Sequence, residues 1–138
     1  MSSFLKTKSD QNIQIAHSIL STNNGCYASS IHCSYYSCVQ LMLHILRSHF
    51  GQTDSEVSAE SESAKGGLHL WLIKKIAAEY EVSTNKYDAR ELKQKLHQLK
   101  KTRGTSDYEN VEITQSTAQR ALQQANNINS SLKRIFNL

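Results

Sequence analysis

The sequence contains no proline and only 5 glycines, so it holds few of the residues that break helices or form tight turns. This scarcity excludes a turn-rich β architecture and favours long helices. Aromatic residues make up 7% of the chain and hydrophobic residues 38%. That modest supply suffices for a helical bundle, because each helix needs only one apolar stripe. The 138 residues are enough for one domain and short for two, so we expect a single all-α domain over residues 1–138.

Long apolar runs are also missing. No run approaches the roughly 18 apolar residues of a membrane-spanning helix, and the first residues lack the apolar core of a secretory signal. The three cysteines, Cys26, Cys33 and Cys38, are odd in number and form no Cys-x-x-Cys pair. A disulfide framework or a structural zinc site is therefore not expected. We predict a cytoplasmic protein with reduced thiols and no membrane partner.

Signals for a metal or a cofactor are absent as well. None of the six histidines has the His-x-x-x-His spacing of a zinc pair on a helix. The chain has no glycine-rich phosphate loop, since Gly66-Gly67 alone is weak evidence, and no Gly-x-Ser-x-Gly elbow. We predict no metal and no cofactor.

Charge is distributed unevenly. The net charge is +4, but residues 51–65 carry four carboxylates against one lysine, whereas residues 66–110 are net basic. The second half presents either a basic binding face or a merely solvated helix face. Residues 52–65 are acidic and serine-rich with no apolar stripe, so we expect a long, mobile loop there.

Apolar residues at steps of three and four predict the helices. The expected helices begin at Ser9 or Asp10, near Ala28, near Leu68, after Asp88 and near Thr114, and the strongest pattern is that of Ala28 to His49. We expect the first helix to end at Asn23-Asn24-Gly25, the second near Phe50-Gly51 and the fourth at Gly104. The predicted fold is an up-and-down bundle of four to five helices.

Arg103 is the first candidate site residue. Leu92, Leu96 and Leu99 form a stripe whose next step falls on Arg103, so a permanent charge is predicted to face the core. Asp107 and Tyr108 follow closely and could partner it. Two readings stay open: an Arg that stabilises a helix end or pins a loop, and an Arg that binds an anion.

The second candidate is the polar run in the helix after Gly25. Tyr35 lies on the apolar stripe, while His32, Tyr36 and Gln40 flank it at steps of four. A line of His, Tyr and Gln is more polar than a core edge requires. It fits a ladder hydrogen-bonded to neighbouring helices, a dimer contact or part of a binding site.

Three segments carry a resemblance to a known family. Residues 23–46, with His-Cys-Ser-Tyr-Tyr at 32–36, resemble the second helix of HEPN domains (higher-eukaryote and prokaryote nucleotide-binding). Residues 63–67, Ser-Ala-Lys-Gly-Gly, are similar to the Ser-His-x-Gly element of that family, with Ala64 in place of His. Residues 99–108 are similar to its Leu-x-x-x-Arg-x-x-Ala-Asp-Tyr element. The matches span roughly residues 9–136 in the family's order.

The resemblance implies a HEPN-like bundle, a homodimer and a site around Arg103. Many HEPN proteins are metal-independent ribonucleases whose Arg is followed four to six residues later by a His. Here Asp107 and Tyr108 stand in those places, no His follows Arg103, and His97 points about 120° away on the same helix. A carboxylate of ordinary pKa is a poor base toward a ribose hydroxyl at neutral pH. The pattern resembles the Arg-x-x-x-Asp-Tyr branch, which lacks the ribonuclease His.

Three functions remain open. The favoured one is a non-catalytic module that binds nucleotide, RNA or protein, paired with a minimal nucleotidyltransferase in a toxin–antitoxin or defence system. The second is a metal-independent ribonuclease toxin whose base is His32, and the third is a structural subunit of a larger assembly. The predicted binding residues are Arg103, Asp107, Tyr108, His32, Tyr35 and Tyr36.

Overall fold

Six α-helices and no strand make up the computed structural model, which describes residues 3–22 and 24–138. The helices are α1 (Phe4–Ser21), α2 (Tyr27–Ser48), α3 (Asp54–Ser63), α4 (Gly67–Ser83), α5 (Lys86–Tyr108) and α6 (Gln115–Ile135). The all-α prediction is confirmed, but the expected count of four to five helices was too low. Of the predicted break after the first helix, Asn23 lies outside the described residues, and Gly25 has the positive φ of 79° expected of a turn glycine.

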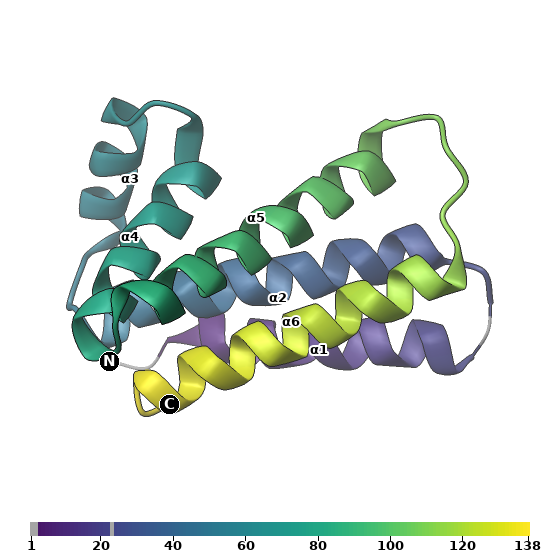
Figure 1. The fold of residues 1–138 in the computed structure, drawn as a ribbon, viewed down its shortest axis with the longest axis horizontal. Coiled ribbons are helices and arrows are strands. Elements are labelled where there is room, and N and C mark those ends of the chain that lie inside the picture. The colour runs from purple at the N-terminus through teal and green to yellow at the C-terminus, as the bar shows by residue number, and fades with distance from the viewer. Residues whose placement is uncertain (1–2, 23) are drawn as a thin grey trace.

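Four helices form the body of the domain, and α3 and α4 stand at one end (Figure 1). The chain runs out along α1 and back along α2, then out again along α5 and back along α6. α4 and α5 leave their shared turn as the two arms of a V (Figure 1). Side chains near the start of α4 and near the end of α5 both contact the first half of α2, through His69 and Arg103 respectively.

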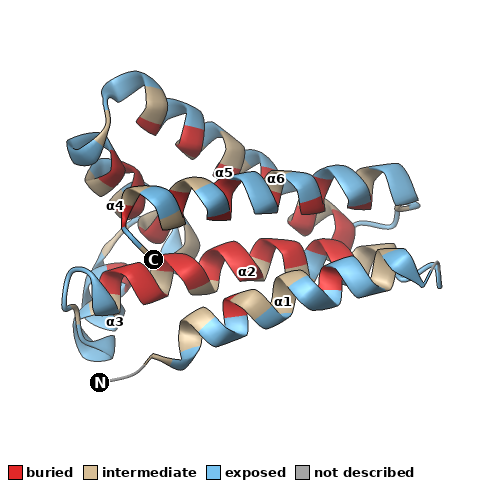
Figure 2. Cartoon of the chain, turned by 90° about the horizontal axis from the view of Figure 1, so that it is seen from below, coloured by how far each residue is buried: buried red, intermediate tan, exposed pale blue. Residues whose placement is uncertain are grey.

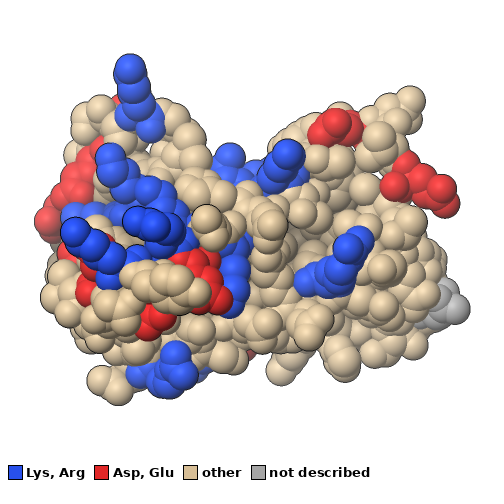
Figure 3. Space-filling view, in the orientation of Figure 1, with Lys and Arg blue, Asp and Glu red and all other residues tan. Residues whose placement is uncertain are grey.

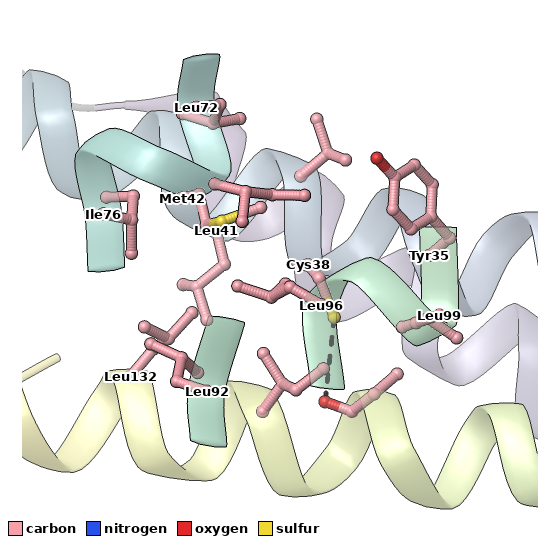
Figure 4. Close-up of a cluster of buried hydrophobic side chains, with 14 of the residues drawn as sticks. Tyr35, Cys38, Leu41, Met42, Leu72, Ile76, Leu92, Leu96, Leu99 and Leu132 are labelled. Atoms are coloured by element: carbon pink, nitrogen blue, oxygen red, sulfur yellow. Dashed lines mark hydrogen bonds between the residues drawn. The ribbon is translucent and has the colours of Figure 1, made fainter. Parts of the chain in front are cut away.

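α2 is the central helix, and side chains of the other helices pack around it. Ile31, Tyr35, Cys38 and Ile45 have no exposed surface, as the predicted stripe requires, and burial runs along nearly its whole length (Figure 2). Figure 4 shows side chains of α4, α5 and α6 meeting those of α2. Burying apolar surface contributes about 25 cal/mol per Å² to stability, so the contacts of α2 with its neighbouring helices are the main stabilising contacts of the fold.

α1 begins earlier than the sequence indicated. Ser3 caps it by accepting a hydrogen bond from the Leu5 N–H at 3.3 Å, so Ser9 is not the cap. Ser9 is buried against α2 instead, and its hydroxyl donates to the Ser37 carbonyl oxygen at 2.7 Å. A serine that was expected to end a loop thus joins two helices.

The predicted loop over residues 52–65 was wrong, because α3 occupies most of it. Thr53 and Glu56 form a capping box: Thr53 Oγ1 accepts from the Glu56 N–H at 3.1 Å, and Glu56 Oε1 accepts from the Thr53 N–H at 3.3 Å. Val57 packs half-buried against the core. Reciprocal capping and one apolar contact sustain a short helix that has no apolar stripe.

Gly104 does not end its helix, contrary to the prediction. α5 starts at Lys86, with Asn85 as its cap, and continues through Gly104 to Tyr108. Arg103 and Asp107 are therefore one helical turn apart on the same face, rather than on opposite sides of a turn. The cap of the last helix, Thr114, is where the sequence placed it.

Replacing Gly104 by Ala is expected to stabilise the protein by about 0.5–1 kcal/mol, because a helix-interior glycine costs roughly that much relative to alanine. The added Cβ meets nothing within 4 Å. Urea unfolding monitored by circular dichroism measures the change in the free energy of unfolding.

Gly66→Ala is the matched comparison. Gly66 has a φ of 93°, and its added Cβ would meet the Leu70 side chain, so this variant is expected to lose stability. Destabilisation by Gly104→Ala would contradict a continuous α5 and restore the predicted stop.

Candidate functional site

The candidate site lies where the end of α5 and the start of α4 meet the first half of α2. Within it, α2 places His32, Tyr35 and Tyr36 on little more than one turn. Tyr35 is fully buried and Tyr36 partly so, while half of the His32 side chain is exposed. The three rings therefore lead from the core to the surface, with ring centroids 4.6 Å apart for His32 and Tyr36 and 5.3 Å for the two tyrosines.

The Arg103 guanidinium packs against aromatic rings. Its Cζ lies 5.0 Å from the ring centroid of Tyr35, 5.6 Å from that of Tyr36 and 5.8 Å from that of Tyr108. Only 11% of the Arg103 side chain is exposed. Aromatic faces attract a cation at this range, and more strongly when water is excluded. The rings thus stabilise a charge that burial would otherwise make costly.

Asp107 bridges Arg103 and His32. Its Oδ2 lies 2.9 Å from His32 Nδ1 and 3.7 Å from an Arg103 terminal nitrogen. Because a carboxylate accepts, His32 Nδ1 carries the proton and donates, which leaves Nε2 as the other ring nitrogen. The Arg103 distance exceeds hydrogen-bond reach. Asp107 therefore orients His32 firmly but holds Arg103 by charge attraction alone.

His69, at the start of α4, completes the arrangement. Its Nδ1 lies 2.8 Å from the Tyr35 hydroxyl oxygen. Burial raises the pKa of Tyr35 far above its ordinary value, although the Arg103 charge acts to lower it. Burial lowers the pKa of His69, and the positive charges of Arg103 and Lys100 lower it further. Both groups are neutral at pH 7, so the bond joins a phenol to an uncharged imidazole.

Arg103 carries an unpaired donor: its Nε is buried without a hydrogen-bond partner. It is one of five such buried side-chain atoms among the described residues, and two of the others belong to Ser106, one turn further along α5, and Ser34, next to Tyr35 in the sequence. A buried donor without a partner costs about 1–3 kcal/mol. An unpaired buried polar group calls for an explanation, and a functional role is one of the explanations.

All six residues predicted from the sequence lie in this arrangement, and the structure adds a seventh. We call the set the Arg103 cluster; its members are His32, Tyr35, Tyr36, His69, Arg103, Asp107 and Tyr108. Their proximity is a finding, whereas their use as a binding site stays a prediction.

Two details of the cluster were not readable from the sequence. His69 stands as a polar residue in the largely apolar run Leu68–Ile73, which is a signal, but its partner is set by how α4 packs on α2. Gln40, which the sequence placed in line with His32 and Tyr36, is not in the cluster. Its Oε1 accepts from Asn12 Nδ2 of α1 at 2.7 Å, as the ladder reading expected.

Comparisons of the chain with protein-family models, curated proteins and solved structures find no match. The HEPN resemblance therefore rests on the motifs at 23–46, 63–67 and 99–108, and what it implies is carried forward as a proposal.

The described residues contain neither a metal-binding group nor a membrane-spanning helix. Over residues 3–22 and 24–138, no group of three or more His, Cys, Asp or Glu side chains is arranged to hold a metal ion. None of the helices in those residues combines the length and the apolar character that a membrane crossing requires. Cys26, Cys33 and Cys38 are free thiols.

The lowered pKa of His69 predicts a pH effect on stability. Between the ordinary histidine pKa, near 6.5, and its own lower value, the unfolded chain takes up a proton that the folded chain does not. The free energy of unfolding therefore falls as the pH drops below about 6.5. His69→Gln, which keeps a hydrogen-bonding side chain without titrating, is expected to lose less stability over this range.

Urea unfolding from pH 7.5 down to 5 measures how steeply the free energy of unfolding falls with pH in the wild type and in the variant. The variant keeps part of this pH dependence, because burial also lowers the pKa of His44 and His97. Equal slopes in the two proteins would contradict a buried, neutral His69.

Proposed function

We propose that this chain is a non-catalytic binding module of HEPN type that holds a phosphate-bearing ligand, a nucleotide or an RNA, at the Arg103 cluster. One observation carries the proposal: a buried guanidinium is held in place by aromatic rings but is only loosely paired with its carboxylate. A purely structural Arg would be expected to satisfy its donors with protein acceptors. Here the buried Nε has none.

The chemistry of the cluster suits a phosphate. A guanidinium presents donors in a planar fork that matches two phosphate oxygens, and such charged hydrogen bonds are the strong ones. Tyr108 is 80% exposed beside Arg103, and Tyr36 is half-buried on its other side. Exposed tyrosine rings next to an Arg can stack on the base of a nucleotide.

The cluster is poorly equipped for proton transfer through its buried members. Tyr35 keeps its proton at neutral pH because burial raises its pKa. The Nδ1 of His69 is engaged with the Tyr35 hydroxyl. These engagements, and the lack of a His after Arg103, support binding without catalysis.

Partners enter this proposal through the resemblance alone. HEPN proteins of the Arg-x-x-x-Asp-Tyr kind imply a homodimer and a minimal nucleotidyltransferase encoded nearby, in a toxin–antitoxin or defence system. A nucleotide made or used by that enzyme would be a ligand consistent with the cluster.

A ribonuclease is the second candidate, and the His32–Asp107 pair favours it. A half-exposed imidazole oriented by a carboxylate, with a guanidinium beside that carboxylate, is an arrangement that can take a proton at Nε2 and stabilise phosphate charge. His32 would then replace the missing motif His from a different helix.

Arg103→Lys is expected to weaken RNA or nucleotide binding about tenfold or more, since an ammonium keeps the charge but loses the fork, and 1.4 kcal/mol corresponds to a factor of ten. Binding is measured with end-labelled single-stranded RNA, tRNA and ATP in chelator. Arg134→Lys, an exposed Arg on α6, is the matched control and should bind as the wild type does. Equal affinity of all three proteins, or no binding by any, would remove Arg103 from this role.

The same RNA incubations separate the two candidates. The binding module predicts intact RNA after long incubation with wild-type protein. Cleavage that persists in chelator and disappears in both His32→Asn and Arg103→Lys would instead establish the ribonuclease. Cleavage that is unchanged in both variants would point to a contaminating nuclease. The binding affinities would then decide whether the Arg103 cluster holds the ligand.

A further inference from the structure

A second concave surface runs along α4 and the first half of α5. Its deeper part is a hollow of about 600 Å³ lined by both helices and by the turn before α4. A hollow of about 320 Å³ toward the α4–α5 turn shares Lys74, Ala78 and Lys93 with it. The two are one continuous surface, which we call the lysine groove, and it shares no residue with the Arg103 cluster.

The floor of the lysine groove is apolar and its rim is basic. Leu70, Trp71 and Ala78 of α4 form the floor, with Leu70 36% exposed. The cations of the lining are Lys65, Lys74, Lys75, Lys86, Arg90 and Lys93. Figure 3 shows Lys and Arg side chains gathered over this end of the molecule.

Most of these cations form no ion pair among the described residues, and Glu81 is the one carboxylate in the lining of the two hollows. Lys75 pairs with Glu60 at 3.4 Å, but within residues 3–22 and 24–138 no ion pair involves Lys65, Lys74 or Lys93. Crowded like charges repel, and an apolar floor beneath them is left partly in contact with water. Both costs fall when an anionic, partly apolar partner covers the groove.

α3 shows within the fold how an acidic helix sits beside these lysines. It has Asp and Glu residues and no Lys or Arg, it packs alongside α4, and Glu60 holds Lys75. Its single half-buried apolar residue, Val57, contacts the core while its carboxylates stay at the surface. Charge pairing on one side and apolar contact beneath are the features that the groove offers a second helix.

We propose that the lysine groove binds an acidic amphipathic helix of a partner protein. Its length follows from α4, whose 17 residues give a straight edge of about 25 Å, enough for some four turns of a bound helix. Apolar residues of the partner cover Trp71 and Leu70, and its Glu and Asp side chains meet Lys74 and Lys93.

Nucleic acid fits the groove less well. Its rim is mainly lysine, which lacks the fork that grips a phosphate, and the one Arg lies at the shallow end. The Trp71 ring, the one large aromatic surface of the floor, has the Lys75 ammonium 6.0 Å from its centroid, so a base stacking there would have to displace this side chain.

The test uses a displayed library of helices of about 18 residues, long enough to span the groove. The helices carry Glu and Asp on one face and varied Leu, Ile, Phe and Ala on the other. A sister library carries Lys in place of the acids, and a uridine oligonucleotide of about 12 nucleotides represents single-stranded nucleic acid. Selected peptides are then titrated into the full-length protein. Trp71 is the only tryptophan in the chain, so its emission reports on the groove itself.

Acidic helices are expected to bind, to shift the Trp71 emission to the blue, and to weaken as salt is added. Lys74→Glu/Lys93→Glu should reduce their affinity at least tenfold. Lys8→Glu/Lys101→Glu, two exposed lysines outside the groove with the same charge change, should not.

Three results would each overturn the proposal. The first is that every selected acidic helix binds the Lys74/Lys93 variant as tightly as it binds the wild type, and the second is that the basic library yields binders equally well. The third is that the oligonucleotide shifts the Trp71 emission and the acidic helices do not. Circular dichroism of each variant excludes loss of fold. An Arg103→Lys variant should bind the acidic helices as the wild type does. The proposal for the lysine groove and the proposal for the Arg103 cluster can therefore fail independently of each other.

Discussion

The packing of the Arg103 guanidinium on Tyr35 is the interaction on which the candidate site depends. A permanent charge is placed on the core-facing stripe of α5, where the alternative residue would be another leucine. Tyr35 is its nearest aromatic neighbour, at 5.0 Å, and that ring is fixed in turn by the core and by His69. Replacing Tyr35 or His69 alone would leave the other without its hydrogen-bond partner, and losing the Tyr35 ring would also leave the buried Arg103 charge without its nearest aromatic neighbour.

That constraint explains why three helices converge at one point. α5 must continue past Gly104 so that Asp107 lies one turn beyond Arg103. α2 must present Tyr35 inward and His32 outward, and α4 must begin close enough for His69 to reach Tyr35. The left-handed Gly66 and Gly67, with φ of 93° and 83°, make the turn from α3 into α4. These glycines shape the site through the backbone.

Much of the fold was predictable because it follows from periodic apolar stripes and caps. The long stripe of α2 and the Thr114 cap are found where the sequence placed them. The errors came from short-range signals judged alone. Gly104 by itself indicates a helix end, but α5 continues through it, with Arg103 and Ser106 buried on either side. The lack of an apolar stripe over residues 54–63 indicates a loop, but Thr53-x-x-Glu56 is a capping-box pattern and predicts the helix that is found.

The candidate site was predictable in its membership but not in its connections. His32 and Tyr36 are i and i+4 on one helix, so local spacing identified that pair. Asp107 was expected beyond a turn at Gly104, and its place one turn from Arg103 follows from the continuation of α5. His32 and Asp107 are 75 positions apart in the sequence, and Tyr35 and His69 are 34 positions apart. Their contacts therefore depend on how the helices pack. A single sequence without that packing does not specify which polar residues meet.

The most direct measurement of the central claim is the side-chain Nε–H resonance of Arg103 in a ¹⁵N-labelled sample titrated with short single-stranded RNA. We expect this resonance to shift as the RNA binds, because a phosphate on the accessible part of the guanidinium changes the charge around Nε. If RNA binds while the Arg103 resonance stays unchanged and only resonances of exposed arginines move, the ligand lies elsewhere and the proposed function of the Arg103 cluster is wrong.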